Sequence, residues 1–131
     1  MGLELSQLHN LLLTPLAAIS IGHLPPAVSA YLKCPLGIAY LSSFSLTHIL
    51  RKHPDVSMMD MLCLPAMIKS GLWVADKRGC ACVFYVHPET AKQYKSAIKA
   101  AGGGYETYIS TFHRCNDRQR QSIVSRGGIL V

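Results

Sequence analysis

The sequence predicts a single α+β domain, in which helices come first and antiparallel strands follow. Its 131 residues match the length of one domain, and 50% of them are hydrophobic, which is enough to build a core. Apolar residues recur at helical spacing in the first half of the chain, most clearly in Ser45–Pro54. In the second half, apolar runs alternate with turn residues, and Tyr105–His113 has the alternation of a strand.

Residues 1–41 contain short runs of both kinds. Leucines at helical spacing predict a helix in the first run, which ends at Thr14-Pro15. The proline at position 26 suits the first turn of a short second helix. The expected elements are helices within Met1–Leu13 and from Pro26 to Lys33, and strands at Ala17–Gly22 and Ile38–Leu41.

Ser45–Pro54 is predicted to form an amphipathic helix with a basic face, capped by a serine at position 42, 43 or 45. Steps of about 100° per residue divide its side chains into an apolar side, with Leu46, Ile49, Leu50 and His53, and a polar side, with Thr47, His48, Arg51 and Lys52. His53 would then lie against the core beside Pro54, where burial shifts a histidine pKa. The same pattern also fits a helix with a solvated charged face and one core histidine.

A second helix is predicted to begin after Ser57, which forms a capping box with Asp60. Pro65 would bend this helix or restart it, because proline lacks the backbone N–H that a helix interior needs. Gly71 would end it, since glycine is common just past the last helical residue.

The C-terminal half is predicted to begin with a β-hairpin, Leu72–Asp76 and Cys80–Val86, whose glycine at position 79 suits a type I turn with a bulge. Tyr94–Ala100 fits either a helix or an alternating strand, and its Ala, Lys and Gln content favours the helix. The remaining segments are a glycine turn at Gly102–Gly104, a strand at Tyr105–His113 and a polar, basic segment at Asn116–Arg126.

The charge balance favours anionic partners. The chain has 13 Lys and Arg against 7 Asp and Glu, a net charge of +6 and a pI near 9.2, which suits phosphate groups or an anionic membrane surface. Five cysteines, an odd number, suggest a reducing compartment. The apolar run Leu11–Ile21 is too short to span a membrane and lacks the basic start of a signal peptide. We therefore expect a cytoplasmic protein without a membrane segment.

Two basic clusters are candidates for chemistry. The first is the helix with His48, Arg51, Lys52 and His53; the second runs from Thr111 through His113 and Arg114 to Arg118 and Arg120. Thr111 and His113 would point to the same face of a strand, and a helix packed over that sheet would bring the clusters together. Histidines, basic groups and a hydroxyl without paired carboxylates suit metal-free cleavage of a phosphodiester, because histidines can transfer both protons and cations stabilise the charge on phosphorus.

Zinc binding and cysteine catalysis are less well supported. Cys80-x-Cys82 and His113-x-Cys115 supply four possible ligands, but their spacing is shorter than that of usual zinc knuckles. Cys34 and Cys63 have no neighbour that would activate a thiolate. We therefore expect no metal and no cofactor.

The succession THILRKHP, a capped helix with LPAMI, a hairpin and YKSAIKAAGGGYETYISTFHR resembles the phage barnase–EndoU–colicin–RelE-like (BECR) nucleases. This superfamily consists of small, metal-independent ribonucleases, and the similarity covers Ser42 to Arg114. It divides the single domain into residues 1–41 without a matched motif, a nuclease-like core at 42–114 and a basic C-terminal segment at 115–131.

The resemblance implies a barnase/RelE-like fold, in which N-terminal helices precede a four-stranded antiparallel meander. It makes Tyr94–Ala100 the third strand, between the hairpin and Tyr105–His113. By their positions in the motif, the implied catalytic residues are His48 or His53, Lys99, Thr111 and His113. The candidate phosphate-binding residues are Arg114, at the end of the motif, and Arg51, Lys52 and Arg118 of the two basic clusters.

The function expected from the resemblance is RNA cleavage by 2′-OH transesterification, in a toxin-like or phage effector protein of bacterial or phage origin. Its partners would be RNA and an acidic inhibitor or immunity protein. An inactive relative that binds RNA or a protein is the first alternative, because one fold hosts several functions. An unrelated structural module with a basic face is the second.

Overall fold

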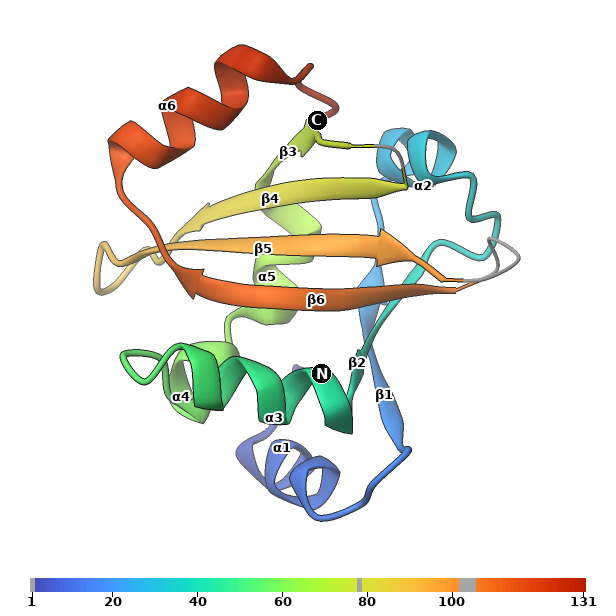
Figure 1. Cartoon of the computed structure of the whole chain (residues 1–131), viewed down its shortest axis with the longest axis vertical. Helices are drawn as coiled ribbons and strands as arrows, with labels where there is room; N and C mark the ends of the chain where they lie inside the picture. Colours follow the sequence, from blue (N-terminus) through green and yellow to red (C-terminus); the bar gives the residue numbers. More distant parts are fainter. Residues whose placement is uncertain (1, 78, 102–105) are drawn as a thin grey trace.

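Six strands form one mixed sheet at the centre of the molecule (Figure 1). The computed structural model describes residues 2–77, 79–101 and 106–131. In sheet order the strands are β1 (Ala18–His23), β2 (Ile38–Ser42), β6 (Thr107–Arg114), β5 (Gln93–Ala100), β4 (Cys80–Val86) and β3 (Leu72–Ala75). The helices are α1 (Leu5–Leu12), α2 (Pro26–Leu32), α3 (Ser43–Lys52), α4 (Met58–Met61), α5 (Leu64–Ser70) and α6 (Asp117–Arg126).

The predicted α+β class is confirmed, but the predicted four-stranded antiparallel sheet is wrong. Strands β3 to β6 do follow one another as antiparallel neighbours. However, β2 joins β6 in parallel, through the pairs Ala39–Thr107 and Tyr40–Tyr108, and β1 pairs with β2. Both N-terminal strands were expected as short apolar runs, but the partner of a short strand depends on packing against distant segments. The order of helices before strands is therefore also wrong, because β1 and β2 alternate with helices.

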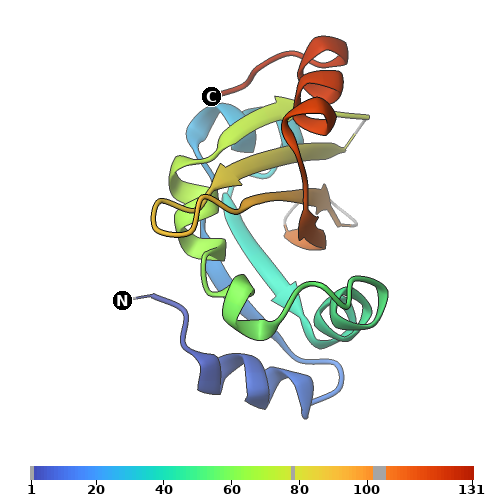
Figure 2. The ribbon, with the colours of Figure 1, turned by 90° about the vertical axis from the view of Figure 1, so that its left-hand side faces the viewer.

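Helices cover the two faces of the sheet unequally (Figure 2). In both views α2 and α5 lie on one side, whereas α3 and α6 lie toward the other. The main core includes Trp73, Ile98 and Phe112, all fully buried. A smaller apolar cluster with Val74 and Phe84 packs against α6. In the part of the chain that the structure describes, no helix combines the length and apolar character that a membrane span requires.

α3 continues directly from β2 and runs beside β6 (Figure 1). The Ser42 side chain accepts a hydrogen bond from a backbone N–H of the first turn, at 3.1 Å, and so caps the helix. Leu46 and Ile49 are fully buried and fix the packed side of the helix. The helix ends just before His53, because the residue before Pro54 is disfavoured in helical backbone. This ending places His53 next to the C-terminal part of β6.

The predicted capping box at the next helix is confirmed. The side chains of Ser57 and Asp60 each accept a hydrogen bond from the backbone N–H of the other residue. The helical segment divides into α4 and α5, with Pro65 in the first turn of α5. The chain turns into β3 at Gly71, where an added Cβ would lie 2.5 Å from the carbonyl oxygen of Met67. Only glycine fits this turn without displacing the helix.

Tyr94–Ala100 belongs to a strand, β5, as the resemblance implies, and not to the helix that its residue propensities favour. β5 pairs along its whole length with β4 and β6, and Tyr94, Ser96 and Ile98 are buried on one face. Sheet packing therefore overrides helix propensity. The expected glycine turn at Gly102–Gly104 and Arg78 of the hairpin turn lie outside the described residues.

The basic C-terminal segment, for which no helix or strand was predicted, contains the helix α6. Asn116 caps it, and the side chain of Gln119 accepts a hydrogen bond from the Asn116 backbone N–H at 2.9 Å. Ile123 and Val124 pack against the smaller apolar cluster. The helix therefore lies over β3 and β4 and borders the uncovered part of the sheet.

Candidate active site

Two histidines from distant elements meet beside the end of β6. His53 directly follows α3, and His113 lies next to the last residue of β6. Their ring centroids are 5.0 Å apart, with 33° between the ring planes. Both residues are partly exposed. A ligand can therefore contact both imidazoles from solvent.

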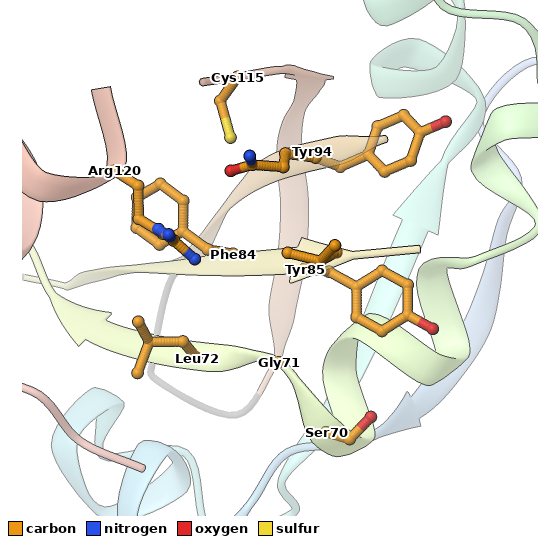
Figure 3. A pocket seen from close by; sticks show the side chains of 10 residues that line it. Ser70, Gly71, Leu72, Phe84, Tyr85, Tyr94, Cys115 and Arg120 are labelled. Carbon is orange, nitrogen blue, oxygen red and sulfur yellow. The ribbon is translucent and has the colours of Figure 1, made fainter. Parts of the chain in front are cut away.

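Strand register divides the neighbouring side chains between two faces of the sheet. Figure 3, drawn around a small cavity at the ends of β4 and β5, shows Tyr94 and Phe84 extending to opposite sides. Lys95 pairs with Phe84 of β4 and with His113 of β6, so these three residues share one face. Arg114 pairs with Tyr94 on the other face, where its guanidinium carbon lies 5.9 Å from the Tyr94 ring centroid.

A β-bulge determines which other residues of β6 share the face of His113. Ala97 pairs with Thr111 and the next residue of β5 pairs with Ile109, so Ser110 is the extra residue. Thr111 Oγ1 accepts the Ala97 backbone N–H at 3.1 Å, which leaves the threonine O–H to donate to a ligand.

The uncovered strip of sheet between α3 and α6, here called the open face, is lined by Tyr40 of β2, Lys95 and Lys99 of β5, and Tyr108, Thr111 and His113 of β6. At its α6 side lies a cavity of about 360 Å³, lined by Lys95, His113, Arg118, Gln119, Ser122, Ile123 and Arg126. Besides the histidine, three of these lining residues are cationic and none is acidic. The cavity therefore suits an anionic group next to His113.

The environment of His53 favours its neutral form. Burial lowers its pKa from 6.5, and the neighbouring His113 lowers it further. Asp55 acts in the opposite sense without reversing the shift. Nδ1 of His113 lies 2.9 Å from the carbonyl oxygen of Arg114. Because a carbonyl oxygen only accepts, this nitrogen carries a hydrogen, and Nε2 is left for proton exchange.

The structure brings together four of the residues singled out in the sequence. His53, Thr111, His113 and Arg118 lie around the same end of the open face. Lys99 shares this face but pairs with Tyr108, four residues along β5 from Lys95. Lys52 is exposed beside His53 and lowers its pKa.

Three other predicted site residues lie elsewhere. His48 and Arg51 line a separate cavity of about 390 Å³ between α3 and the segment that follows α1. The His48 ring stacks on the exposed ring of Phe44, with centroids 6.5 Å apart. Arg114 lies on the opposite face, as described above. Of the two helix histidines, His53 is thus the one that meets the strand histidine.

Lys95 and Arg126 line the cavity but were missed as site residues. The alternation of β5 places Lys95 and Lys99 on one face, so the sequence does carry a signal for Lys95. The motif of the BECR nucleases directs attention to Lys99 instead. Only the register between β5 and β6 shows that Lys95 is the lysine opposite His113.

Two of the cysteines considered as ligands or nucleophiles, Cys82 and Cys63, lie in surroundings that keep the thiol protonated. Cys82 donates its thiol hydrogen to Asp76 at 3.2 Å, and burial together with this bond raises its pKa to about 12. Burial also raises the pKa of Cys63 to about 12, so neither thiol ionises readily at neutral pH. Within residues 2–77, 79–101 and 106–131, no three His, Cys, Asp or Glu side chains are grouped so that they would hold a metal ion.

Comparisons of this chain with protein-family models, curated proteins and solved structures find no match. Function is therefore inferred from the geometry of the site.

Proposed function

We propose that this protein is a metal-independent endoribonuclease that cleaves RNA by 2′-OH transesterification. One observation carries the proposal: the rings of His53 and His113 lie 5.0 Å apart beside a basic cavity. Two imidazoles at this separation can contact neighbouring oxygens of one phosphodiester, which is what paired acid and base catalysis requires. The resemblance to BECR nucleases supports the same reaction class.

The lowered pKa of His53 indicates that His53 is the base and His113 the acid. Because burial and His113 lower this pKa, His53 is neutral near pH 7 and accepts the proton of the 2′-OH. The 2′ oxygen then attacks the adjacent phosphorus, and a 2′,3′-cyclic phosphate forms. The bond from phosphorus to the 5′ oxygen breaks as His113, in its protonated form, donates the Nε2 proton to that oxygen.

The surrounding groups stabilise the charge that develops on the non-bridging phosphate oxygens. Lys95 lies directly across from His113 in the sheet and lines the cavity. The Thr111 hydroxyl lies on the same face and is available as a donor. Arg118 and Arg126 add positive charge at the α6 side of the cavity. Such preorganised donors act on the transition state because they need no rearrangement during the reaction.

The direct test is incubation of the purified protein with an RNA oligonucleotide in excess chelator, followed by mass analysis of the ends. We expect 2′,3′-cyclic phosphate and 5′-hydroxyl ends, and no cleavage of an oligonucleotide with a single 2′-deoxy substitution at the cut site. Cleavage that requires a divalent cation would contradict the proposal. Salt-sensitive RNA binding without cleavage would instead support the inactive relative.

A cytoplasmic ribonuclease of this kind would require control in the cell that makes it. The basic cavity beside His113 and the net charge of +6 suit an acidic inhibitor or immunity protein, and we propose such a partner. It would compete with RNA for Arg118 and Arg126. The active protein and His113→Gln are expressed separately, and the growth of the two cultures is compared. Growth arrest with the active protein alone would show that an inhibitor is needed.

A further inference from the structure

We propose that Tyr40 and Tyr108 form a nucleobase-stacking subsite that holds single-stranded RNA on the open face. This inference rests on the proposed ribonuclease function and extends it to the way in which the substrate is held. The two tyrosines are paired across β2 and β6, and their ring centroids lie 5.8 Å apart with 37° between the planes. Neither ring belongs to the buried core of the described residues.

The β-bulge is the reason that this pair shares a face with the histidines. Tyr108 and His113 are an odd number of residues apart, and in a regular strand they would point to opposite faces. The extra residue, Ser110, restores them to one face. Its hydroxyl donates to the Ala97 carbonyl at 3.0 Å, which holds the bulge in place.

The groups around Tyr108 favour stacking over hydrogen bonding. Its hydroxyl is bonded to the side chain of Glu106, so its hydrogen-bonding capacity is already partly used. The half-exposed ring is then the surface left for a ligand. The Glu106 carboxylate also disfavours a phosphate at this point, whereas a neutral base can pack on the rings.

Distance and charge connect the subsite to the catalytic histidines. His113 lies five positions after Tyr108 in β6, which corresponds to about 15 Å. This span excludes binding of one nucleotide at both places, so the stacked base belongs to a neighbouring nucleotide. Lys99 pairs with Tyr108 and Lys95 pairs with His113. Each position thus has a cation for the backbone, the combination typical of single-strand binding sites.

The subsite selects unpaired RNA because bases in a duplex already stack on their neighbours. The test uses a fluorescent, fully 2′-O-methylated RNA strand, which lacks the nucleophile and so reports binding without cleavage. Binding is measured by fluorescence anisotropy for the wild type and for Tyr40→Leu, Tyr108→Leu, Tyr40→Phe and Tyr108→Phe. Tyr85→Leu is the matched control, since Tyr85 is a half-buried tyrosine that points to the other side of β4 (Figure 3).

We expect each leucine variant at positions 40 and 108 to bind about 5- to 150-fold more weakly, the range for loss of one stacked base. Both phenylalanine variants and Tyr85→Leu should bind as the wild type does. An abasic substitution at the stacked nucleotide should weaken binding to the wild type but not to Tyr108→Leu. Folded leucine variants, verified by circular dichroism, that bind with unchanged affinity would overturn the proposal. If tyrosine-dependent binding occurs without any cleavage of natural RNA, the ribonuclease proposal fails and the subsite stands.

Discussion

His53 and His113 face each other across the boundary between a helix and a sheet, with ring centroids 5.0 Å apart. The approach depends on the parallel contact of β2 with β6, because α3 begins where β2 ends. The N-terminal strands thus position one half of the histidine pair. Any change that separates β2 from β6 should also separate the two imidazoles.

Replacing either histidine of the pair should abolish most of the activity. We expect His53→Gln and His113→Gln each to lower kcat by about 10²- to 10⁴-fold, the usual contribution of one acid or base. His48→Gln is the matched control, because His48 lies on the same helix but lines a different cavity. Single-turnover cleavage of an RNA oligonucleotide measures the effect. Equal losses in all three variants would contradict the assignment of the site to His53 and His113.

The two histidines should also be coupled in their titration. Burial and His113 both lower the pKa of His53, so its NMR titration should have a midpoint below 6.5. In His113→Gln the midpoint should rise toward 6.5, while the part due to burial remains. The activity should follow a bell in pH whose acidic limb reflects the lowered value, although both limbs belong to the pair. A midpoint that does not respond to His113→Gln would show that the rings do not interact.

The titration of His53 has a consequence for stability. Its pKa is lower in the folded protein than in the unfolded chain, so the unfolded chain binds more protons as the pH falls below 6.5. The free energy of unfolding should therefore decrease through that window. In His53→Gln this part of the decrease should be absent, as measured by urea unfolding of both proteins at several pH values. A decrease of the same size in the variant would mean that other groups cause it.

Lys95 should contribute more to catalysis than Arg114, although both are close to His113 in sheet position. Lys95 shares the face of His113, and Arg114 lies on the opposite face over Tyr94. We expect Lys95→Gln to lower kcat/KM by about 10²- to 10³-fold, as for loss of one transition-state donor. Arg114→Gln should change kcat/KM by much less. Steady-state kinetics at constant ionic strength measures both variants. A larger loss in Arg114→Gln than in Lys95→Gln would place the substrate on the other face.

The contact between Tyr94 and Asp60 should stabilise the fold near the site. The Tyr94 hydroxyl donates to Asp60 Oδ1, and Lys92 lies 3.7 Å from the same carboxylate oxygen. Burial tends to raise the pKa of Asp60, but the hydrogen bonds from Tyr94 and Ser57 outweigh it and hold the pKa below 3.8. Tyr94→Phe should lower the free energy of unfolding at neutral pH by about 1–3 kcal/mol.

Protonation of Asp60 weakens this contact, so the loss in Tyr94→Phe should shrink as the pH falls below 3.8. Tyr85→Phe serves as the control, because no residue in the described part of the chain is seen to accept a hydrogen bond from the Tyr85 hydroxyl. Chemical unfolding at neutral and acidic pH measures both variants. A loss in Tyr94→Phe that does not change with pH would contradict a bond to the ionised carboxylate.

Local signals in the sequence predict most individual elements but not the way in which they join. The capping box at Ser57 and the hairpin strands are encoded by nearby residues and agree with the structure. The addition of β1 and β2 to the sheet depends on the pairing of Tyr40 with Tyr108, which are far apart in the chain. β5 shows the opposite case, because the neighbours on both sides impose a strand on residues that favour a helix.

The sequence predicts those site residues that are recognisable by their type. It does not predict those that depend on how β5 pairs with β6. Helical spacing predicts His53 on the packed side of the helix, but α3 ends before His53, so its contact with His113 depends on the non-helical backbone at that residue. Lys95 became recognisable only from its pairing with His113. The bulge at Ser110 leaves no clear mark in the sequence, so simple alternation places Tyr108 on the wrong face.

The assignment of His113 as the acid is tested most directly with an RNA substrate in which sulfur replaces the 5′ leaving oxygen at the cut site. A thiolate leaves without being protonated, so the acid is no longer needed, whereas the base is. We predict that this substrate restores cleavage by His113→Gln to nearly the wild-type rate and leaves His53→Gln impaired. Equal impairment of both variants, or rescue of His53→Gln instead, would contradict the proposed roles of the pair.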